Sequence, residues 1–399
     1  MKMRRLIVLI VIITIFLLAG ILLFYLKNKN SSSTETIQKP ILYIGWIGPL
    51  SGSVKILGVD NFNSVQLAFE QYAKRKNEND PEIRLVAADD QYQVRQSIRE
   101  YDKMVSKYKP IAIFLSTYSS VEFLYQKALK DNIILIDPID NDLNLASLNK
   151  PWHPNAFMIA KETEGLAAII ANILVKQNKK NIIAIYYNGD DFMPTLADTL
   201  NKILKSSGKE LKLFGYNDAH HDNFNNFIRW GKNHQADAYV FFGYVELRLV
   251  MKKIRDMNIT APFYSVNVVS SPSFRKDTKK TLNKIFIAHF TKLDGNQALA
   301  NEFMKLYQQR YHQYPDAEWV ALQSYDASNI LIYAIHEALS KPTVGKNNLA
   351  EAIRQSLIRI SDYPGTAGTI SIKPSGASDG IYPSLYILEN DKVIPYSQQ

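Results

Sequence analysis

Hydroxyl, amide and carboxylate side chains follow three apolar segments in the first third of the chain. The loops after residues 41–47, 111–115 and 133–136 read Gly48-Pro49-Leu50-Ser51-Gly52, Ser116-Thr117-Tyr118-Ser119-Ser120 and Asp137-Pro138-Ile139-Asp140-Asn141. Hydroxyl groups, and the free backbone N–H groups at the start of a helix, suit an anionic group. We therefore expect these loops to hold a small ligand.

Residues that would suggest catalysis have simpler explanations. The pair Asp89-Asp90 offers two carboxylates for acid–base work, but loop solvation and helix capping explain it as well. No histidine follows Ser51 or Ser119 at a spacing typical of a nucleophilic triad. The cluster His220-His221-Asp222 suggests a metal site, or else an N-cap ahead of a helix. We expect no enzyme, no metal and no cofactor.

The elements that position these loops alternate between strand and helix. Unbroken apolar segments near 41–47, 83–88, 111–115 and 133–137 are separated by helical patterns at 60–77, 93–107 and 120–131. A second alternating series begins near residue 162, and a helical stretch runs from about 297 to 359. Strands without polar alternation are typical of a parallel sheet covered on both faces, whose ligands bind beyond the carboxyl ends of the strands.

The N-terminus predicts a membrane segment. Residues 6–26 are apolar, which corresponds to about 31 Å of helix against a hydrocarbon core of about 30 Å. Basic residues precede this run and favour a cytoplasmic N-terminus, so that the rest of the chain lies outside. A cleaved signal peptide is the alternative. Leu18-Ala19-Gly20 resembles part of a lipoprotein cleavage box, but Ile21 replaces the cysteine that would carry the lipid.

Composition excludes several classes of protein. The chain has no cysteine, which excludes disulfides, thiol catalysis and thiolate metal sites. Its net charge is +9, but five basic residues lie in the first 30 positions, where there is no acidic residue. The remaining basic residues are scattered, which argues against nucleic-acid binding. Residues 28–40 are polar and predict a tether.

The loops and their spacing resemble the type I periplasmic binding proteins, in the branch of the leucine/isoleucine/valine-binding protein. The resemblance covers residues 41–390 and is carried by four stretches: residues 44–52 with Gly58, Asp89-Asp90-Gln91, residues 116–138, and Phe241-Phe242-Gly243-Tyr244. It implies an α/β fold with two doubly wound parallel-sheet lobes joined by three crossovers. We expect residues 41–155 and 289–364 in lobe 1, and residues 156–288 and 365–399 in lobe 2.

The resemblance also implies a ligand site between the lobes. From lobe 1, Ser119 and Ser120 fall where amino-acid binders hold the ligand carboxylate, although either serine can instead cap the following helix. Asn141 replaces a threonine hydroxyl, the carbonyl of Ile139 accepts from a ligand amine, and Leu57 replaces an aromatic residue. From lobe 2, Phe192 and Tyr244 supply aromatic rings. Asn267 stands where those proteins place the glutamate that pairs with the ligand ammonium.

These expectations lead to a function and an alternative. The first is an extracytoplasmic solute-binding protein of an ABC-type importer, held at the membrane by its N-terminal helix, which captures a small polar or carboxylate-bearing metabolite. The second is a membrane-anchored sensor or regulator of envelope enzymes that uses the same fold to bind a protein. A functional amino-acid site and a degenerate site remain open at this point.

Overall fold

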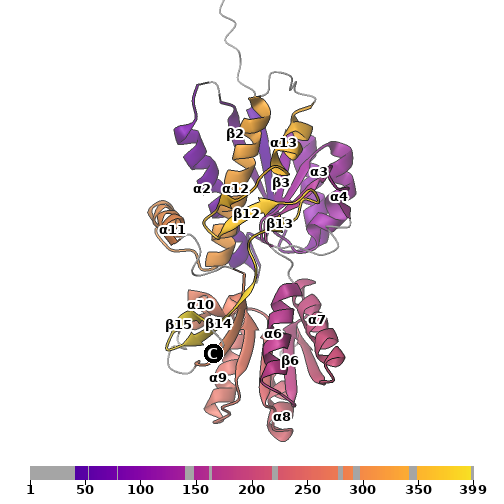
Figure 1. The fold of residues 1–399 in the computed structure, drawn as a ribbon, viewed down its shortest axis with the longest axis vertical. Coiled ribbons are helices and arrows are strands. Elements are labelled where there is room, and N and C mark those ends of the chain that lie inside the picture. The colour runs from indigo at the N-terminus through magenta and orange to yellow at the C-terminus, as the bar shows by residue number, and fades with distance from the viewer. Residues whose placement is uncertain are drawn as a thin grey trace, which may run out of the picture. The chain divides into compact units, whose positions relative to one another are not determined.

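The computed structural model describes residues 41–52, 54–78, 80–139, 148–160, 164–217, 223–276, 282–290, 297–340 and 348–396 (Figure 1). The expected N-terminal membrane segment, the tether, Asn141 and the His220-His221-Asp222 cluster lie outside these ranges. Within them, no helix combines the length and apolarity needed to cross a membrane. Residues Leu42–Glu78 and Ile83–Gln399 form one compact unit.

The first half of the chain forms a five-stranded sheet in the order β2-β1-β3-β4-β5. Its elements are β1 (Ile41–Gly48), α2 (Lys55–Arg75), β2 (Glu82–Asp89), α3 (Val94–Tyr108), β3 (Ala112–Leu115), α4 (Ser120–Asp131), β4 (Ile134–Asp137) and β5 (Ala156–Met158). The pairs β1–β3, β3–β4 and β4–β5 are parallel. The expected parallel α/β sheet is confirmed.

Both faces of this sheet are covered, which explains the unbroken apolar strands. Ala112 and Phe114 of β3 belong to a core shared with α2, whereas Ile113 and Leu115 belong to a core shared with α3 and α4. Successive side chains of a strand point to opposite faces, so a strand buried on both faces has no polar alternation. The loops at the carboxyl ends of these strands are therefore held by two cores.

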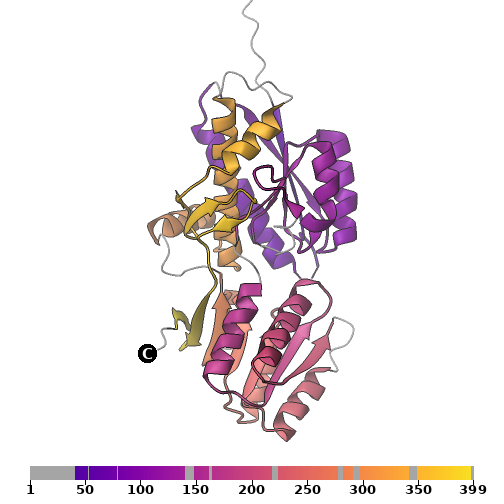
Figure 2. The ribbon, with the colours of Figure 1, turned by 45° about the vertical axis from the view of Figure 1, so that its right-hand side comes forward.

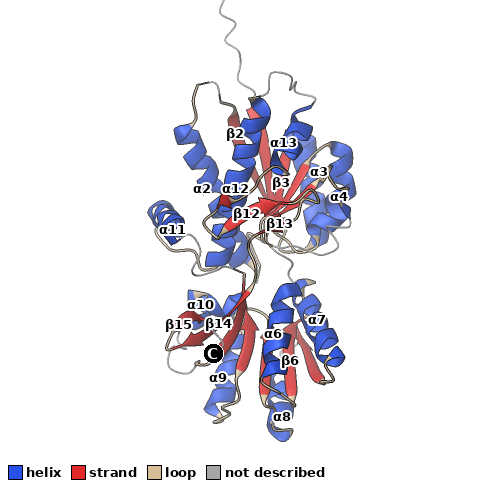
Figure 3. Ribbon diagram, viewed as in Figure 1, coloured by secondary structure: helices blue, strands red, loops and turns tan. Residues whose placement is uncertain are grey.

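The second sheet has seven strands in the order β15-β14-β10-β9-β8-β6-β7 (Figure 3). Its elements are α6 (Glu164–Lys176), β6 (Ile182–Tyr187), α7 (Phe192–Ser206), β7 (Leu211–Tyr216), α8 (Asn223–Asn233), β8 (Ala238–Phe242), α9 (Leu247–Asp256), β9 (Phe263–Val266), η1 (Asn267–Ser270), α10 (Pro272–Arg275), β10 (Ile285–His289), β14 (Ser384–Glu389) and β15 (Lys392–Pro395). The pairings from β7 to β10 are parallel, and β14 and β15 add an antiparallel edge.

The remaining elements pack with the first sheet. They are α11 (Gln297–Tyr311), α12 (Glu318–Leu339), α13 (Leu349–Leu357) and a small sheet in the order β11-β12-β13 (Tyr363–Pro364, Thr369–Ile372 and Ser378–Asp379). Figure 2 shows the small sheet beside α12 from a second direction. Ile370 and Ile372 of β12 join the core that α12 shares with α2.

Two strands next to the expected lobe boundaries pack with the first sheet. We expected lobe 2 to begin at residue 156, but β5 pairs with β4 and extends the first sheet to Met158. We also expected residues after 364 in lobe 2, but the apolar side of β12 is buried against the first core, and Met158 bridges to Ala377. The chain passes between the two large sheets after β5, after β10 and between β13 and β14.

Buried carboxyl groups make the stability of the fold depend on pH. Asp326 of α12 accepts hydrogen bonds from the backbone N–H groups of Thr366 and Ala367 at 2.7 and 2.8 Å. Burial raises its pKa to about 7, although these hydrogen bonds oppose the shift. Burial likewise raises the pKa of Asp60 to about 6. Each group holds its proton more tightly in the folded state than in the unfolded chain.

We expect the free energy of unfolding to increase as the pH is lowered from about 8 to about 5. Each such carboxyl contributes up to about 1.4 kcal/mol per pH unit, because its stabilising contribution is lost as the pH rises through its folded-state pKa. Urea titrations at a series of pH values would measure this slope. Asp326→Asn should flatten part of it, whereas the exposed control Asp256→Asn should not. An unchanged slope in Asp326→Asn would contradict this assignment.

Candidate functional site

Two aspartates hold the loops at the carboxyl end of the first sheet. Asp89 accepts hydrogen bonds from the backbone N–H of Leu50 at 2.9 Å and from the hydroxyl of Ser51 at 2.6 Å. Burial alone would raise the pKa of Asp89, but these hydrogen bonds outweigh it and lower the pKa. Asp90 accepts from the hydroxyls of Ser97 and Thr117 at 2.7 and 2.6 Å, and burial raises its pKa. The pair therefore positions the ligand loops.

The two serines at the start of α4 have different surroundings. Ser120 is fully buried, and its backbone N–H and its hydroxyl both donate to the carbonyl of Thr117, at 3.0 and 2.5 Å. Neither donor of Ser120 is therefore available to a ligand. Ser119 occupies the N-cap position with φ of 64° and makes no side-chain capping hydrogen bond. Because its hydroxyl is not used for capping, Ser119 stays the better candidate of the two.

A tyrosine–carboxylate network lies at the carboxyl end of the second sheet. The Tyr244 hydroxyl donates to Asp190 Oδ2 at 2.7 Å, and the Tyr216 hydroxyl donates to Glu246 Oε1 at 2.5 Å. The ring of Tyr187 makes edge contacts with both tyrosines, at centroid distances of 5.5 and 5.6 Å. Burial raises the pKa of Asp190 to about 6 and the pKa of Tyr244 well above its usual value. This network fixes the Tyr244 ring.

Five of the eight predicted ligand residues line one pocket, which we call the cleft pocket. Its lining consists of Leu57, Ile139, Phe192, Tyr244 and Asn267 together with Tyr92, Met193, Val266, Val268, Phe290, Trp319 and Val320. Its free volume is about 30 Å³, which is room for one or two water molecules. Ser119 and Ser120 are not part of this lining. Tyr118, the residue before Ser119, packs against Phe192 with ring centroids 5.4 Å apart.

Asn267 presents a donor to the cleft pocket. The residue is buried, and its side-chain oxygen accepts a hydrogen bond from the backbone N–H of Phe290 at 3.2 Å. Within the described ranges no hydrogen bond engages the Asn267 NH₂ group. An amide NH₂ donates only, so it suits a carboxylate or carbonyl oxygen of a ligand and cannot pair with an ammonium.

Several residues of the site escaped prediction from the sequence. Asp190 follows β6 at the carboxyl end of its strand, a position that could have identified it. Tyr92 lies just after the Asp89-Asp90 pair in the loop that follows β2, so its position after a strand could likewise have identified it. Trp319 lies at the start of α12, and no local sequence pattern marks it as a site residue.

The chain also contains a G-x-S-x-G pattern at residues 376–380, which is typical of a serine nucleophile. Ser378 lies on β13, however, and its buried hydroxyl donates to the carbonyl of Ile159 at 2.6 Å.

Trp46 of β1 has a structural role. It is fully buried, and its Nε1 donates to Asn61 Oδ1 at 2.8 Å, so the indole packs in the core of the first sheet. Within the described ranges, no group of three or more histidine, aspartate or glutamate residues is arranged to hold a metal ion. Glu246, the N-cap residue of α9, is partly buried, and its carboxylate accepts the hydrogen bond from Tyr216.

Comparisons with known proteins identify the fold and the family. Three solved structures share the fold: the leucine-binding protein LivK of Thermotoga maritima (17% identity, TM-score 0.74, 89% of this chain and 98% of the other), LivJ of Streptococcus pneumoniae with isoleucine (19%, 0.73, 89% and 98%) and a solute-binding protein of R. palustris with benzoate (14%, 0.72, 90% and 96%). No curated protein matches the sequence. The model of the periplasmic binding protein family matches residues 42–380. The chain therefore belongs to the periplasmic binding proteins, which bind solutes and are not enzymes.

Proposed function

We propose that the protein is the extracytoplasmic solute-binding component of an ABC-type importer, and that its ligand is a small carboxylate-bearing metabolite. One observation carries the choice of ligand. Asn267 directs an amide NH₂ group at the cleft pocket, because its oxygen is already bonded to Phe290. A site with a donor and no acid favours a ligand oxygen over a ligand ammonium.

The walls of the cleft pocket favour an apolar or aromatic body for this ligand. Phe192, Tyr244, Phe290 and Trp319 contribute rings, and Leu57 contributes an aliphatic side chain. Similar structures have been solved with isoleucine and with benzoate, so the fold accommodates both kinds of ligand. The benzoate-bound protein is the better guide here, because benzoate has a carboxylate and no amine. Ser119 and Asn141 complete the proposed site as donors, and Ile139 contributes its apolar side chain to the wall, because its carbonyl oxygen can accept only from a ligand donor such as an amine.

Binding requires the walls of the cleft pocket to move apart. A free volume of about 30 Å³ is far below the 300–1,000 Å³ or so typical of small-molecule sites. In our proposal, the two lobes move relative to each other, and the ligand stabilises a closed arrangement only as far as it prefers that arrangement. Lobe 1 would comprise residues 41–158 with 297–379, and lobe 2 residues 164–289 with 384–396.

The location follows from the family and from the N-terminal sequence. We propose that residues 6–26 span the membrane and that residues 28–40 tether the binding domain outside it. A permanent anchor would keep the binding domain near a permease. The mass of the mature protein distinguishes the anchor from a cleaved signal peptide.

Thermal unfolding of the full-length protein with a ligand panel tests the proposed function. The panel contains aromatic and aliphatic carboxylates, α-amino acids, amides, sugars and purines. A true ligand at 100 times its Kd adds about 2.7 kcal/mol to the free energy of unfolding and raises Tm by a few degrees. We expect carboxylates without an amine to give the largest shifts. Larger shifts with α-amino acids than with carboxylates would contradict the assigned ligand class.

A protein partner is the second candidate function. The small free volume of the cleft pocket favours it, since a pocket filled by its own side chains holds no solute. This candidate is a membrane-anchored sensor or a regulator of envelope enzymes. A flat response to the whole ligand panel would favour it, and crosslinking would then show a stoichiometric protein partner without a permease.

A further inference from the structure

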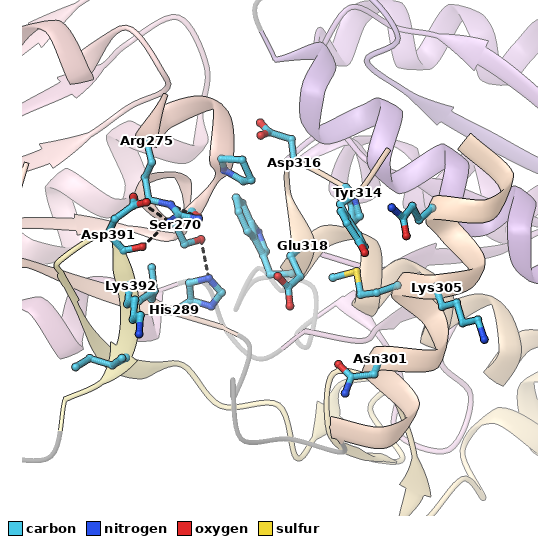
Figure 4. A pocket seen from close by; sticks show the side chains of 17 residues that line it. Ser270, Arg275, His289, Asn301, Lys305, Tyr314, Asp316, Glu318, Asp391 and Lys392 are labelled. Carbon is cyan, nitrogen blue, oxygen red and sulfur yellow. Dashed lines mark hydrogen bonds and ion pairs between the residues drawn. The ribbon is translucent and has the colours of Figure 1, made fainter. Parts of the chain in front are cut away.

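A second cavity, of about 810 Å³, adjoins the cleft pocket. It is lined by residues 270–275 and His289 near the end of the second sheet, by the outer side of α11, by residues 314–319 and by β15. Figure 4 shows Glu318 within this lining, with Ser270 and His289 on one flank and Lys305 on the other. Its volume lies within the range of known small-molecule sites, unlike that of the cleft pocket.

The two cavities share a wall. Trp319 lines both of them. The turn η1 begins at Asn267, which lines the cleft pocket, and ends at Ser270, which lines the second cavity. The Ser270 hydroxyl donates to the Asn267 carbonyl at 2.6 Å and lies 3.0 Å from His289 Nε2, which must then be the donor of that second bond. Trp319 and the turn η1 therefore lie between the two cavities, and a ligand in either cavity would contact them.

Three of the charged side chains of the second cavity are already engaged. Arg275 pairs with Asp391 at 3.2 Å. Asp316 accepts hydrogen bonds from the backbone N–H of Ser273 at 2.7 Å and from the Ser273 hydroxyl. These groups shape the cavity, but their charges are satisfied within the protein.

The remaining charges are one acid and two bases. Within the described ranges no hydrogen bond or ion pair engages the side chains of Glu318, Lys305 and Lys392, which all line the cavity (Figure 4). Glu318 reaches solvent, yet burial among its neighbours raises the pKa of its carboxyl, and Arg275 opposes the shift. The next residue along α12 is Trp319, so a carboxylate and an indole line the same cavity.

We propose that this cavity is a second ligand site, which binds a zwitterionic small molecule. The Glu318 carboxylate pairs with the ligand ammonium beside the Trp319 ring, a combination of charge and aromatic face that suits a cation. Lys305 and Lys392 lie on opposite sides of Glu318 (Figure 4), so the ligand carboxylate pairs with one of the two lysines, and the separation of the two ligand charges must match the distance from Glu318 to that lysine. The site is distinct from the cleft pocket, where the neutral Asn267 offers no charge partner to an ammonium.

Three compounds with five-carbon chains test the charge pattern: δ-aminovalerate, the diamine cadaverine and the diacid glutarate. Calorimetric titration of the full-length protein should show saturable binding of δ-aminovalerate and weaker binding of the other two. Glu318→Gln should reduce the affinity for δ-aminovalerate by about tenfold or more, which corresponds to the loss of one charged contact. Glu337→Gln, an exposed change of the same kind on the same helix, should leave this affinity unchanged.

Each outcome decides the proposal. Absence of saturable δ-aminovalerate binding at millimolar concentrations, or equal binding by Glu318→Gln and the wild type, would overturn it. Equal binding of glutarate and δ-aminovalerate would also overturn it, because Glu318 would then contribute nothing. Unchanged thermal unfolding of Glu318→Gln without ligand shows that the variant is folded. Because Glu318 does not line the cleft pocket, the Glu318→Gln variant should respond to the cleft ligand panel as the wild type does.

Discussion

Exchange of Asn267 for glutamate should convert the cleft pocket from a site for carboxylates into one for α-amino acids. The new carboxylate supplies the charge partner that an ammonium requires, in a buried position where charge-paired hydrogen bonds are strong. Coupling energies of close charge pairs at binding interfaces are about 1.5–7 kcal/mol, and every 1.4 kcal/mol is a factor of about ten in Kd. We expect affinity for α-amino acids to rise at least about tenfold. Affinity for simple carboxylates should fall, because like charges repel.

The matched control is Asn267→Gln, which has the length of glutamate without its charge. Either side chain adds one methylene next to a pocket with about 30 Å³ of free space. Calorimetric titrations of both variants with leucine and benzoate would separate charge from size. If both variants changed preference equally, space would be responsible and the assigned role of Asn267 would be wrong. If neither changed, Asn267 would not select the ligand.

Much of the first sheet and of the cleft pocket follows from local patterns. Unbroken apolar strands indicate burial on both faces, and β3 shows why: Phe114 and Ile113 enter different cores. Loops after such strands meet at one edge of their own sheet, which needs no knowledge of long-range contacts. Ile139 follows a strand of the first sheet, whereas Tyr244 and Asn267 follow strands of the second, so the prediction that they share a site came from the family resemblance; they do line one pocket.

The features of the fold and of the site that the sequence did not indicate depend on long-range packing and on the geometry of individual turns. The strand β5 has three residues, too few for any periodicity, so the sequence did not indicate its pairing with β4 in the first sheet. Ile370 is buried by helices distant in sequence, so its place in the first core had no local signal. The adjacent Ser119 and Ser120 look equivalent in sequence, and only the turn at Thr117 shows that the Ser120 hydroxyl is occupied.

Replacement of Gly58 by alanine should destabilise the protein strongly. Gly58 lies in α2, where alanine normally favours the helix by about 1 kcal/mol. Here, however, an alanine Cβ would lie 1.8 Å from the carbonyl oxygen of Pro49, in the loop after β1. Backbone cannot give way as a flexible side chain can, so α2 and the loop must separate. Overpacking costs about 1–3 kcal/mol and occasionally more, and we expect a loss at or above the top of that range.

The sign of the change makes the Gly58→Ala experiment decisive, since helix propensity and steric overlap predict opposite results. Urea unfolding should show a lower midpoint with an unchanged slope. Gly165→Ala is the matched control in helix α6, because its Cβ would meet only a ring carbon of Pro383 at 2.9 Å, which ring puckering can relieve. A variant Gly58→Ala as stable as the wild type would mean that α2 does not approach the loop so closely. Because Leu57 lines the cleft pocket, the same substitution should also weaken ligand binding.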